Sequence, residues 1–154
     1  MVQLASRQTN LSIFTARGEL NPSEIVAAYK AFIENGPTPL VLWDITAATL
    51  AALSVRAAQD LARQLTRLHD GCRMDGRSAV VCSREIDFGV ANLLISYARL
   101  EGHPVQVQTF RTANDATRWL TQAHDLRARV APSPANRCGP LYPAAAMPAA
   151  VPTS

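Results

Sequence analysis

The chain alternates short apolar runs with longer segments of helical periodicity, and this alternation constrains its fold more than any other feature. Apolar runs of strand length occur at residues 40–45 (LVLWDI), 78–83 (SAVVCS) and 105–110 (VQVQTF). Such runs are typical of strands that are buried on both faces of a parallel sheet. A helical segment follows each run, after Ser54, near Glu85 and at Thr112. The pattern therefore predicts repeated strand–helix–strand units with right-handed crossovers.

Two further strands and one helix are expected at the N-terminus. Residues 2–8 and 10–20 both show the period-2 hydrophobicity of strands. The helix that follows has a strong start, because Asn21 is suited to cap it, Pro22 to open it, and Glu24 to complete a capping box. The complete order is ββαβαβαβα. It predicts an α/β fold in which helices cover a mostly parallel sheet with an antiparallel N-terminal edge strand.

The composition changes sharply near residue 130. The last 25 residues carry six of the ten prolines and a single charged residue, Arg137. Prolines remove backbone donors and restrict the residues before them, so neither a helix nor a strand is expected there. The sequence thus predicts one domain at 1–129 and a flexible tail at 130–154.

Several classes of protein are disfavoured by composition. No apolar run is long enough to cross a bilayer and no secretory signal is recognisable, so we expect a cytoplasmic protein. The net charge of +3 comes almost wholly from scattered arginines, which does not favour nucleic acid as a partner.

Metal chemistry and catalysis have no support in the sequence. The odd set of Cys72, Cys82 and Cys138 lacks any CxxC spacing, and the three histidines lack ligand spacing, so no metal or other cofactor is expected. There is no serine elbow, glycine-rich phosphate loop or paired-carboxylate motif. We therefore expect a protein that is not an enzyme, with no catalytic residue.

Particular segments carry a resemblance to a known family. They are ARGEL before the first helix, PLVLWDI as the next strand, LS at the following helix start, SAVVCSREIDFGVANLL, and VQTFRTANDATRWL. Together they span residues 10 to 120 and resemble the SpoIIAA-like family, within the bacterial STAS and Sec14-like group of domains. The resemblance implies the STAS fold. In antagonist-type STAS domains a partner kinase phosphorylates a serine at the start of the helix after the central strand. Ser54 occupies that place, within AALSV rather than an Asp-Ser-Ser-Gly-Leu-like run.

Polar residues are expected to gather at the carboxyl edge of the parallel sheet, where ligands of such folds usually bind. They are Asp44, Ser54, Ser83, Arg84 and Arg111. Arginines and helix N-termini suit a carboxylate, a phosphate or a phosphorylated side chain. In the alternative interpretation, Ser54, Ser83 and Thr112 cap helices and the arginines pair with Asp44, Glu85 or Asp115. Ser54 is then a cap rather than a phosphorylation site.

The third helix, from residue 85, is apolar over more of its circumference than one buried face requires. It could offer a face to a second copy of the chain in a homodimer, or cover an apolar pocket. Our leading hypothesis is a non-enzymatic module that binds a protein partner or a small anionic ligand at the carboxyl edge. The alternative is a carrier of a small apolar, lipid-like ligand in a pocket under the third helix.

Overall fold

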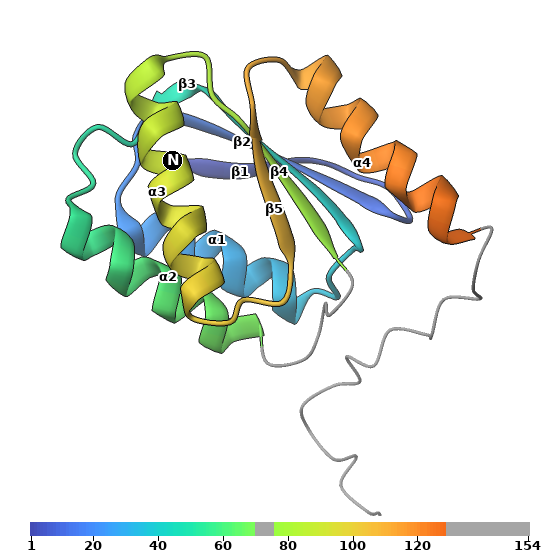
Figure 1. Ribbon diagram of the computed structural model, residues 1–154, viewed down its shortest axis with the longest axis horizontal. Helices are drawn as coiled ribbons and strands as arrows, with labels where there is room; N and C mark the ends of the chain where they lie inside the picture. Colours follow the sequence, from blue (N-terminus) through green and yellow to red (C-terminus); the bar gives the residue numbers. More distant parts are fainter. Residues whose placement is uncertain (70–75, 129–154) are drawn as a thin grey trace, which may run out of the picture.

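Five strands form one sheet in the computed structural model, which describes residues 1–69 and 76–128 (Figure 1). The strands lie in the order of the sequence: β1 (Val2–Arg7), β2 (Leu11–Glu19), β3 (Leu40–Thr49), β4 (Arg77–Val81) and β5 (Gln106–Phe110). The β1 strand runs antiparallel to β2, and every later pair is parallel. The predicted fold class and element order are confirmed.

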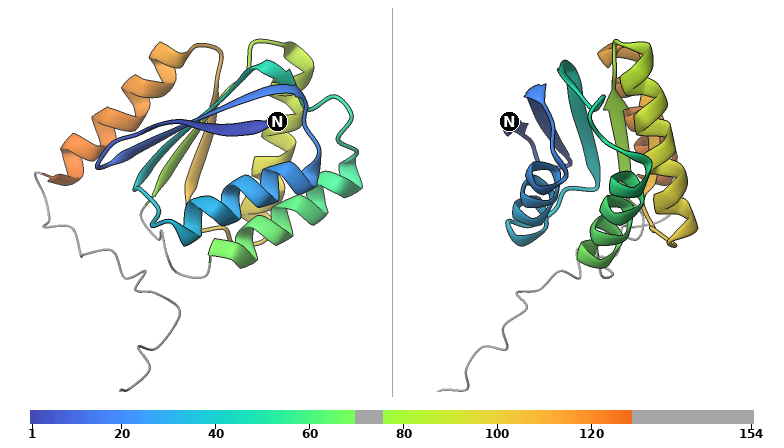
Figure 2. Two further views of the ribbon diagram at one scale, coloured as in Figure 1. Left: turned by 180° about the vertical axis from the view of Figure 1, so that it is seen from behind. Right: turned by 90° about the vertical axis from the view of Figure 1, so that its left-hand side faces the viewer.

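Helices cover both faces of this sheet, as Figures 1 and 2 show. One face carries α1 (Pro22–Glu34), α2 (Val55–His69) and α3 (Glu85–Leu100), and the other carries α4 (Ala113–Ala128). The first three helices connect parallel strands that are added in one direction, and crossovers of one hand place them on one face. The α4 helix follows the last described strand and does not connect two strands, so the handedness of crossovers does not decide its face. Its Ala116 and Leu120 pack on Leu42 and Val81 of the opposite face.

The first helix begins as the sequence predicts. The Asn21 Oδ1 atom accepts a hydrogen bond from the Glu24 backbone N–H at 2.9 Å, and Glu24 Oε2 accepts one from the Asn21 backbone at 3.4 Å. Both arms of the capping box are therefore present, and each satisfies a backbone donor that the helix leaves without a partner.

The third strand is longer than the sequence predicts. Its apolar run suggests an end at Ile45, but β3 continues to Thr49. Parallel pairing with β2 shifts register after Thr15 and then resumes, until Glu19 lies opposite Thr49. Pairing with the neighbouring strand, rather than hydrophobicity, thus decides where β3 ends. As a result only residues 50–54 separate the strand from α2.

Both tryptophans pack between the sheet and the helices. Trp43 stacks on Phe14 with ring centroids 4.3 Å apart, beneath α1. Trp119 contacts Phe110 at 5.5 Å on the α4 face.

Some predictions fall outside the described residues. These are most of the turn between α2 and β4, including Cys72, and the Pro/Ala-rich tail at 130–154 with Cys138. The division into a domain at 1–129 and a tail stays a prediction. Among the residues that the structure describes, no helix is long and apolar enough to cross a membrane.

Candidate functional site

The start of α2 presents a small exposed surface next to the end of β3. Ser54 caps the helix, since its Oγ accepts a hydrogen bond from the Ala57 backbone N–H at 3.2 Å. Ala51, Ala52 and Val55 beside it are exposed, Val55 to 56%, whereas Leu53 is buried and the exposed Arg56 follows on the helix. We call Ala51, Ala52, Ser54 and Val55 the α2 patch.

A buried carboxylate holds this loop in place from the neighbouring helix. Asp87, in the first turn of α3, is only 1% exposed. Its Oδ1 accepts hydrogen bonds from the Leu50 backbone N–H at 2.7 Å and from Thr49 Oγ1 at 3.0 Å. Its Oδ2 accepts one from Arg84 Nε at 2.7 Å. The end of β3 and the start of α3 are thus tied together through one side chain.

The environment of Asp87 keeps its carboxylate ionised. Burial alone raises the pKa of a carboxyl group, because it penalises the charged form. The hydrogen bonds from the Leu50 backbone, Arg84 and Thr49 outweigh burial, and the pKa of Asp87 lies below its usual value. At neutral pH the tie is therefore a charged one.

Both predicted arginines have carboxylate partners. Arg84 pairs with Asp87, which the sequence analysis did not foresee, and its Nη2 also reaches the Ala48 carbonyl at 3.3 Å. Arg111 pairs with Glu85 at 2.6 Å, as one interpretation of the sequence proposed. The Arg111 guanidinium also lies 4.0 Å from the centre of the Phe88 ring. The positive charge of each arginine is therefore already matched by a carboxylate of the chain, which leaves it less available for an anionic ligand.

The predicted helix caps are present at two of three helices. Thr112 Oγ1 accepts a hydrogen bond from the Asp115 backbone at 3.2 Å at the start of α4, and Ser54 does the same at α2. The predicted cap by Ser83 is wrong, because the α3 N-cap residue is Arg84 and makes no side-chain cap bond. Ser83 instead lies 3.4 Å from the Thr46 carbonyl.

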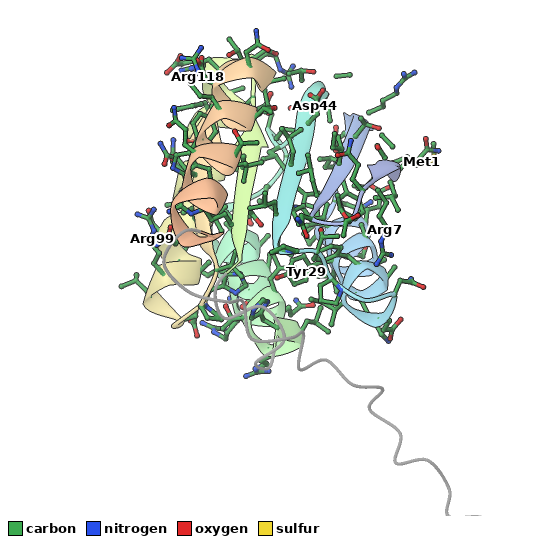
Figure 3. The ribbon with its side chains drawn as sticks, turned by 90° about the vertical axis from the view of Figure 1, so that its right-hand side faces the viewer. Met1, Arg7, Tyr29, Asp44, Arg99 and Arg118 are labelled. Atoms are coloured by element: carbon green, nitrogen blue, oxygen red, sulfur yellow. The ribbon has the colours of Figure 1, made fainter. Side chains whose placement is uncertain are left out.

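Asp44 is separate from the α2 patch. Its Oδ1 accepts hydrogen bonds from the backbone and hydroxyl of Thr46 at 3.0 and 2.6 Å. Because Leu40 and Leu42 of β3 face α4, strand alternation directs Asp44 to that face as well. Ser54 begins a helix on the opposite face. Figure 3 shows Asp44 near the upper edge of the sheet. The five predicted residues therefore do not form one cluster.

A second candidate site lies between the sheet and the helices α1, α2 and α3. It is a pocket of about 120 Å³, and α3 covers it with Ala91, Leu94, Ile95 and Ala98. The remaining wall is mostly apolar as well and comes from the sheet, α1 and α2: Val2, Ala16, Leu20, Ile25, Ile45, Leu50, Leu65, Val80 and Val107. Pockets of this kind are typical of sites for small apolar molecules.

A few polar side chains line this pocket together with Trp43. They are Tyr29, Ser78 and His103. The Tyr29 hydroxyl shares a hydrogen bond of 3.0 Å with Nδ1 of the buried His69, whose ring centre lies 5.0 Å from that of His103. Figure 3 shows Tyr29 between the sheet and the helices.

Sequence reasoning treated these histidines as unrelated because they are far apart in the chain. One signal connects them: His69 ends α2 shortly before β4, and His103 precedes β5. Both therefore lie toward the amino edge of adjacent parallel strands. In the described ranges, no group of three or more histidine, cysteine or acidic residues could hold a metal ion.

The chain resembles a solved structure but matches no curated protein by sequence. No protein-family model matches the sequence, and no curated protein matches it. Among solved structures, the chain is similar to the anti-sigma factor antagonist SpoIIAA in its unphosphorylated form. The two share 14% sequence identity at a TM-score of 0.44, over 86% of this chain and 100% of that one.

Proposed function

We propose that this protein is a non-enzymatic binding module that engages a protein partner through the α2 patch. The observation that carries this proposal is the threefold hydrogen bonding of the buried Asp87 to Leu50, Thr49 and Arg84. This carboxylate fixes the loop that presents Ala51, Ala52, Ser54 and Val55 to solvent. A surface ordered before binding loses less conformational entropy when the partner arrives.

The chemistry of the patch suits a protein better than a small anion. Val55 supplies an exposed apolar side chain, and the alanines beside it allow close approach. Arg84 and Arg111 already meet carboxylates, which reduces the attraction of these two side chains for a free anion. A partner surface with an apolar centre and polar rim is the expected match.

Ser54 gives this patch a possible means of regulation, and we propose it as a phosphorylation site. Its hydroxyl is exposed at a helix N-terminus, where a phosphate is electrostatically compatible with the helix dipole. Phosphorylation would then leave α2 folded while placing two negative charges beside Val55. An apolar contact with a partner would be weakened.

The experiment is affinity capture from host extract, compared quantitatively between variants. A partner of this patch is enriched on the wild-type chain and on Gln64→Glu, an exposed control on the same helix, but not on Val55→Glu. For regulation, Ser54→Asp should release that partner and Ser54→Ala should retain it. If every captured protein is retained equally by Val55→Glu and Gln64→Glu, partner binding at this patch is refuted.

A second candidate function is favoured by the pocket under α3. Its volume of about 120 Å³ is close to that of apolar cavities of roughly 150 Å³ that bind benzene. Together with Tyr29, Ser78 and His103 on the wall, this suits a small apolar molecule with one hydrogen-bonding group. We propose a carrier or sensor of such a molecule as the alternative role.

Indole and benzene are suitable probes for this alternative, with binding followed by thermal shift and by isothermal titration calorimetry. Ala91→Leu would place added carbon atoms in the pocket and abolish binding, whereas Ala27→Leu, at an exposed position of α1, would leave binding intact. Absence of probe binding to the wild-type chain, or equal binding by Ala91→Leu, would remove this candidate.

A further inference from the structure

The third helix carries an apolar face that is left exposed in the described part of the chain. Its inner face packs on the sheet and neighbouring helices through Asp87, Ala91, Ile95 and Ala98. Its outer face carries a row of residues at alternating steps of three and four, which we call the outer stripe: Ile86, Gly89, Leu93, Ser96 and Leu100. Ile86 is 55% exposed and Leu100 is 82% exposed. This spacing is that of the contact seam between paired helices.

Gly89 is not required by any close contact within residues 1–69 and 76–128. A glycine inside a helix lowers stability by about 1 kcal/mol relative to alanine. Here a Cβ atom would meet nothing within 4 Å, so none of the neighbours that the structure describes requires a glycine at this position. A glycine on an outer helix face does permit another backbone to approach closely.

The sizes of the side chains in the outer stripe are arranged symmetrically about Leu93. Large apolar residues stand at its ends, Ile86 and Leu100, and small residues stand between them and the centre, Gly89 and Ser96. A twofold axis at Leu93 would place each residue opposite its counterpart in an antiparallel second helix. Contact surfaces of symmetric dimers have to be self-complementary in this way.

The charges along one flank of the stripe obey the same symmetry. The flank carries Glu85, Asn92 and Arg99, which are all exposed. Each also makes a contact within its own chain: Glu85 pairs with Arg111, Asn92 accepts a hydrogen bond from the Thr109 hydroxyl, and Arg99 donates one to the Val107 carbonyl. In an antiparallel pair these positions face one another, so that Glu85 opposes Arg99 of the second copy and Asn92 opposes itself. In a parallel pair the flank would instead face Val90 and Tyr97 of the second copy, which carry no charge to pair with Glu85 or Arg99. Arg99 is labelled in Figure 3, and the hydrogen bond from its Nη2 to the Val107 carbonyl of β5 measures 3.3 Å.

We propose that the outer stripe is the contact surface of an antiparallel homodimer, with α3 of each copy crossing the other at Leu93. The occupant is a second copy because both the size pattern and the charges are complementary to themselves. A contact limited to two helices of this length falls at the small end of stable interfaces, which is roughly 1,200 Å² of total buried surface. The dimer is therefore reversible and depends on concentration.

Sedimentation of the full chain across micromolar to submillimolar concentrations tests the dimer. Leu100→Glu changes a residue that is mostly exposed, so the monomer stays folded, and Leu93→Glu places two like charges at the axis. Both should weaken dimerisation roughly tenfold or more, equivalent to at least about 1.4 kcal/mol. Leu4→Glu, at an exposed leucine of β1, is the matched control and should leave the dimer unchanged. Circular dichroism verifies the fold of each variant.

A charge exchange tests the antiparallel orientation. Glu85→Arg or Arg99→Glu alone brings like charges together between the copies and should weaken the dimer, whereas the double exchange should restore it. Loss of the Glu85–Arg111 pair within one chain cannot produce such a rescue, because the double variant lacks this pair as well. The proposal is overturned if the chain is monomeric throughout, if Leu100→Glu and Leu93→Glu dimerise like the wild type, or if the double exchange fails to rescue.

Discussion

The hydrogen bonds of Asp87 allow a quantitative prediction. In Asp87→Ala, the buried Leu50 N–H loses its acceptor, which costs about 1–3 kcal/mol, and the charge-assisted bond from Arg84 disappears as well. We expect the free energy of unfolding to fall by about 3–4 kcal/mol at neutral pH. Asp87→Asn keeps an oxygen for Leu50 but cannot accept from Arg84, so a loss of about 1–2 kcal/mol is expected.

The effect should depend on pH in a defined direction. The pKa of Asp87 in the folded chain lies below the ordinary value of about 3.9. Its stabilising contribution is therefore complete above that value and is lost as the pH falls through it toward the folded-state pKa. The stability difference between the wild type and Asp87→Asn should shrink accordingly from neutral pH to about pH 3.

Urea denaturation followed by circular dichroism at both pH values measures this difference. Asp60→Asn is the control, because it removes an exposed carboxylate paired with Arg63 and should change stability by less than about 1 kcal/mol. Hydrogen exchange at the Leu50 amide should accelerate in Asp87→Ala. The reasoning is refuted if Asp87→Asn and Asp60→Asn are equally stable at neutral pH, or if the Asp87→Asn difference persists unchanged in acid.

Three further predictions concern other parts of the molecule. Removal of the α2 cap in Ser54→Ala should lower the free energy of unfolding by about 1 kcal/mol in urea denaturation, whereas Ser54→Asp, which can still cap, should cost less. A cavity lowers the free energy of unfolding by about 24 cal/mol per Å³, so filling the whole pocket would raise it by about 3 kcal/mol. Ala91→Leu fills part of the pocket and should raise the free energy of unfolding by about 1–2 kcal/mol, as measured by thermal denaturation. A large loss of stability would show that the pocket cannot receive the side chain. Burial and, to a smaller extent, the negative charge of Asp87 raise the pKa of Cys82, whereas the positive charge of Arg111 lowers it. The net result is a pKa of about 11. Iodoacetamide at about pH 8 should therefore label Cys82 only after unfolding, as peptide mapping would reveal.

The order of strands and helices could be predicted because it depends on local patterns. Asn21, Pro22 and Glu24 define a helix start within four residues, and Ser54 and Thr112 cap their helices with neighbours three residues away. The end of β3 could not be predicted, because residues 46–49 are held as a strand by pairing with β2 rather than by their own hydrophobicity.

The candidate sites were harder to predict because they combine distant segments. Asp87 lies in the first turn of α3, where an acidic residue is favoured by the helix dipole, and nothing local indicates that it accepts a hydrogen bond from Leu50, 37 residues earlier. The approach of His69 to His103 likewise depends on the packing of α2 against the sheet. In both cases the tertiary fold, rather than the local sequence, brings the interacting groups together.

The order of the strands also has a consequence for synthesis of the chain. Every strand pairs with the one made immediately before it, so the sheet can grow as the chain leaves the ribosome, without waiting for a distant segment. Such local pairing favours rapid folding. One face is completed late, since Leu40, Leu42, Ala79 and Val81 have no helix to cover them until α4 has been made. A chain halted before α4 would hold a paired sheet with an apolar surface still exposed, the state in which this protein is most open to aggregation.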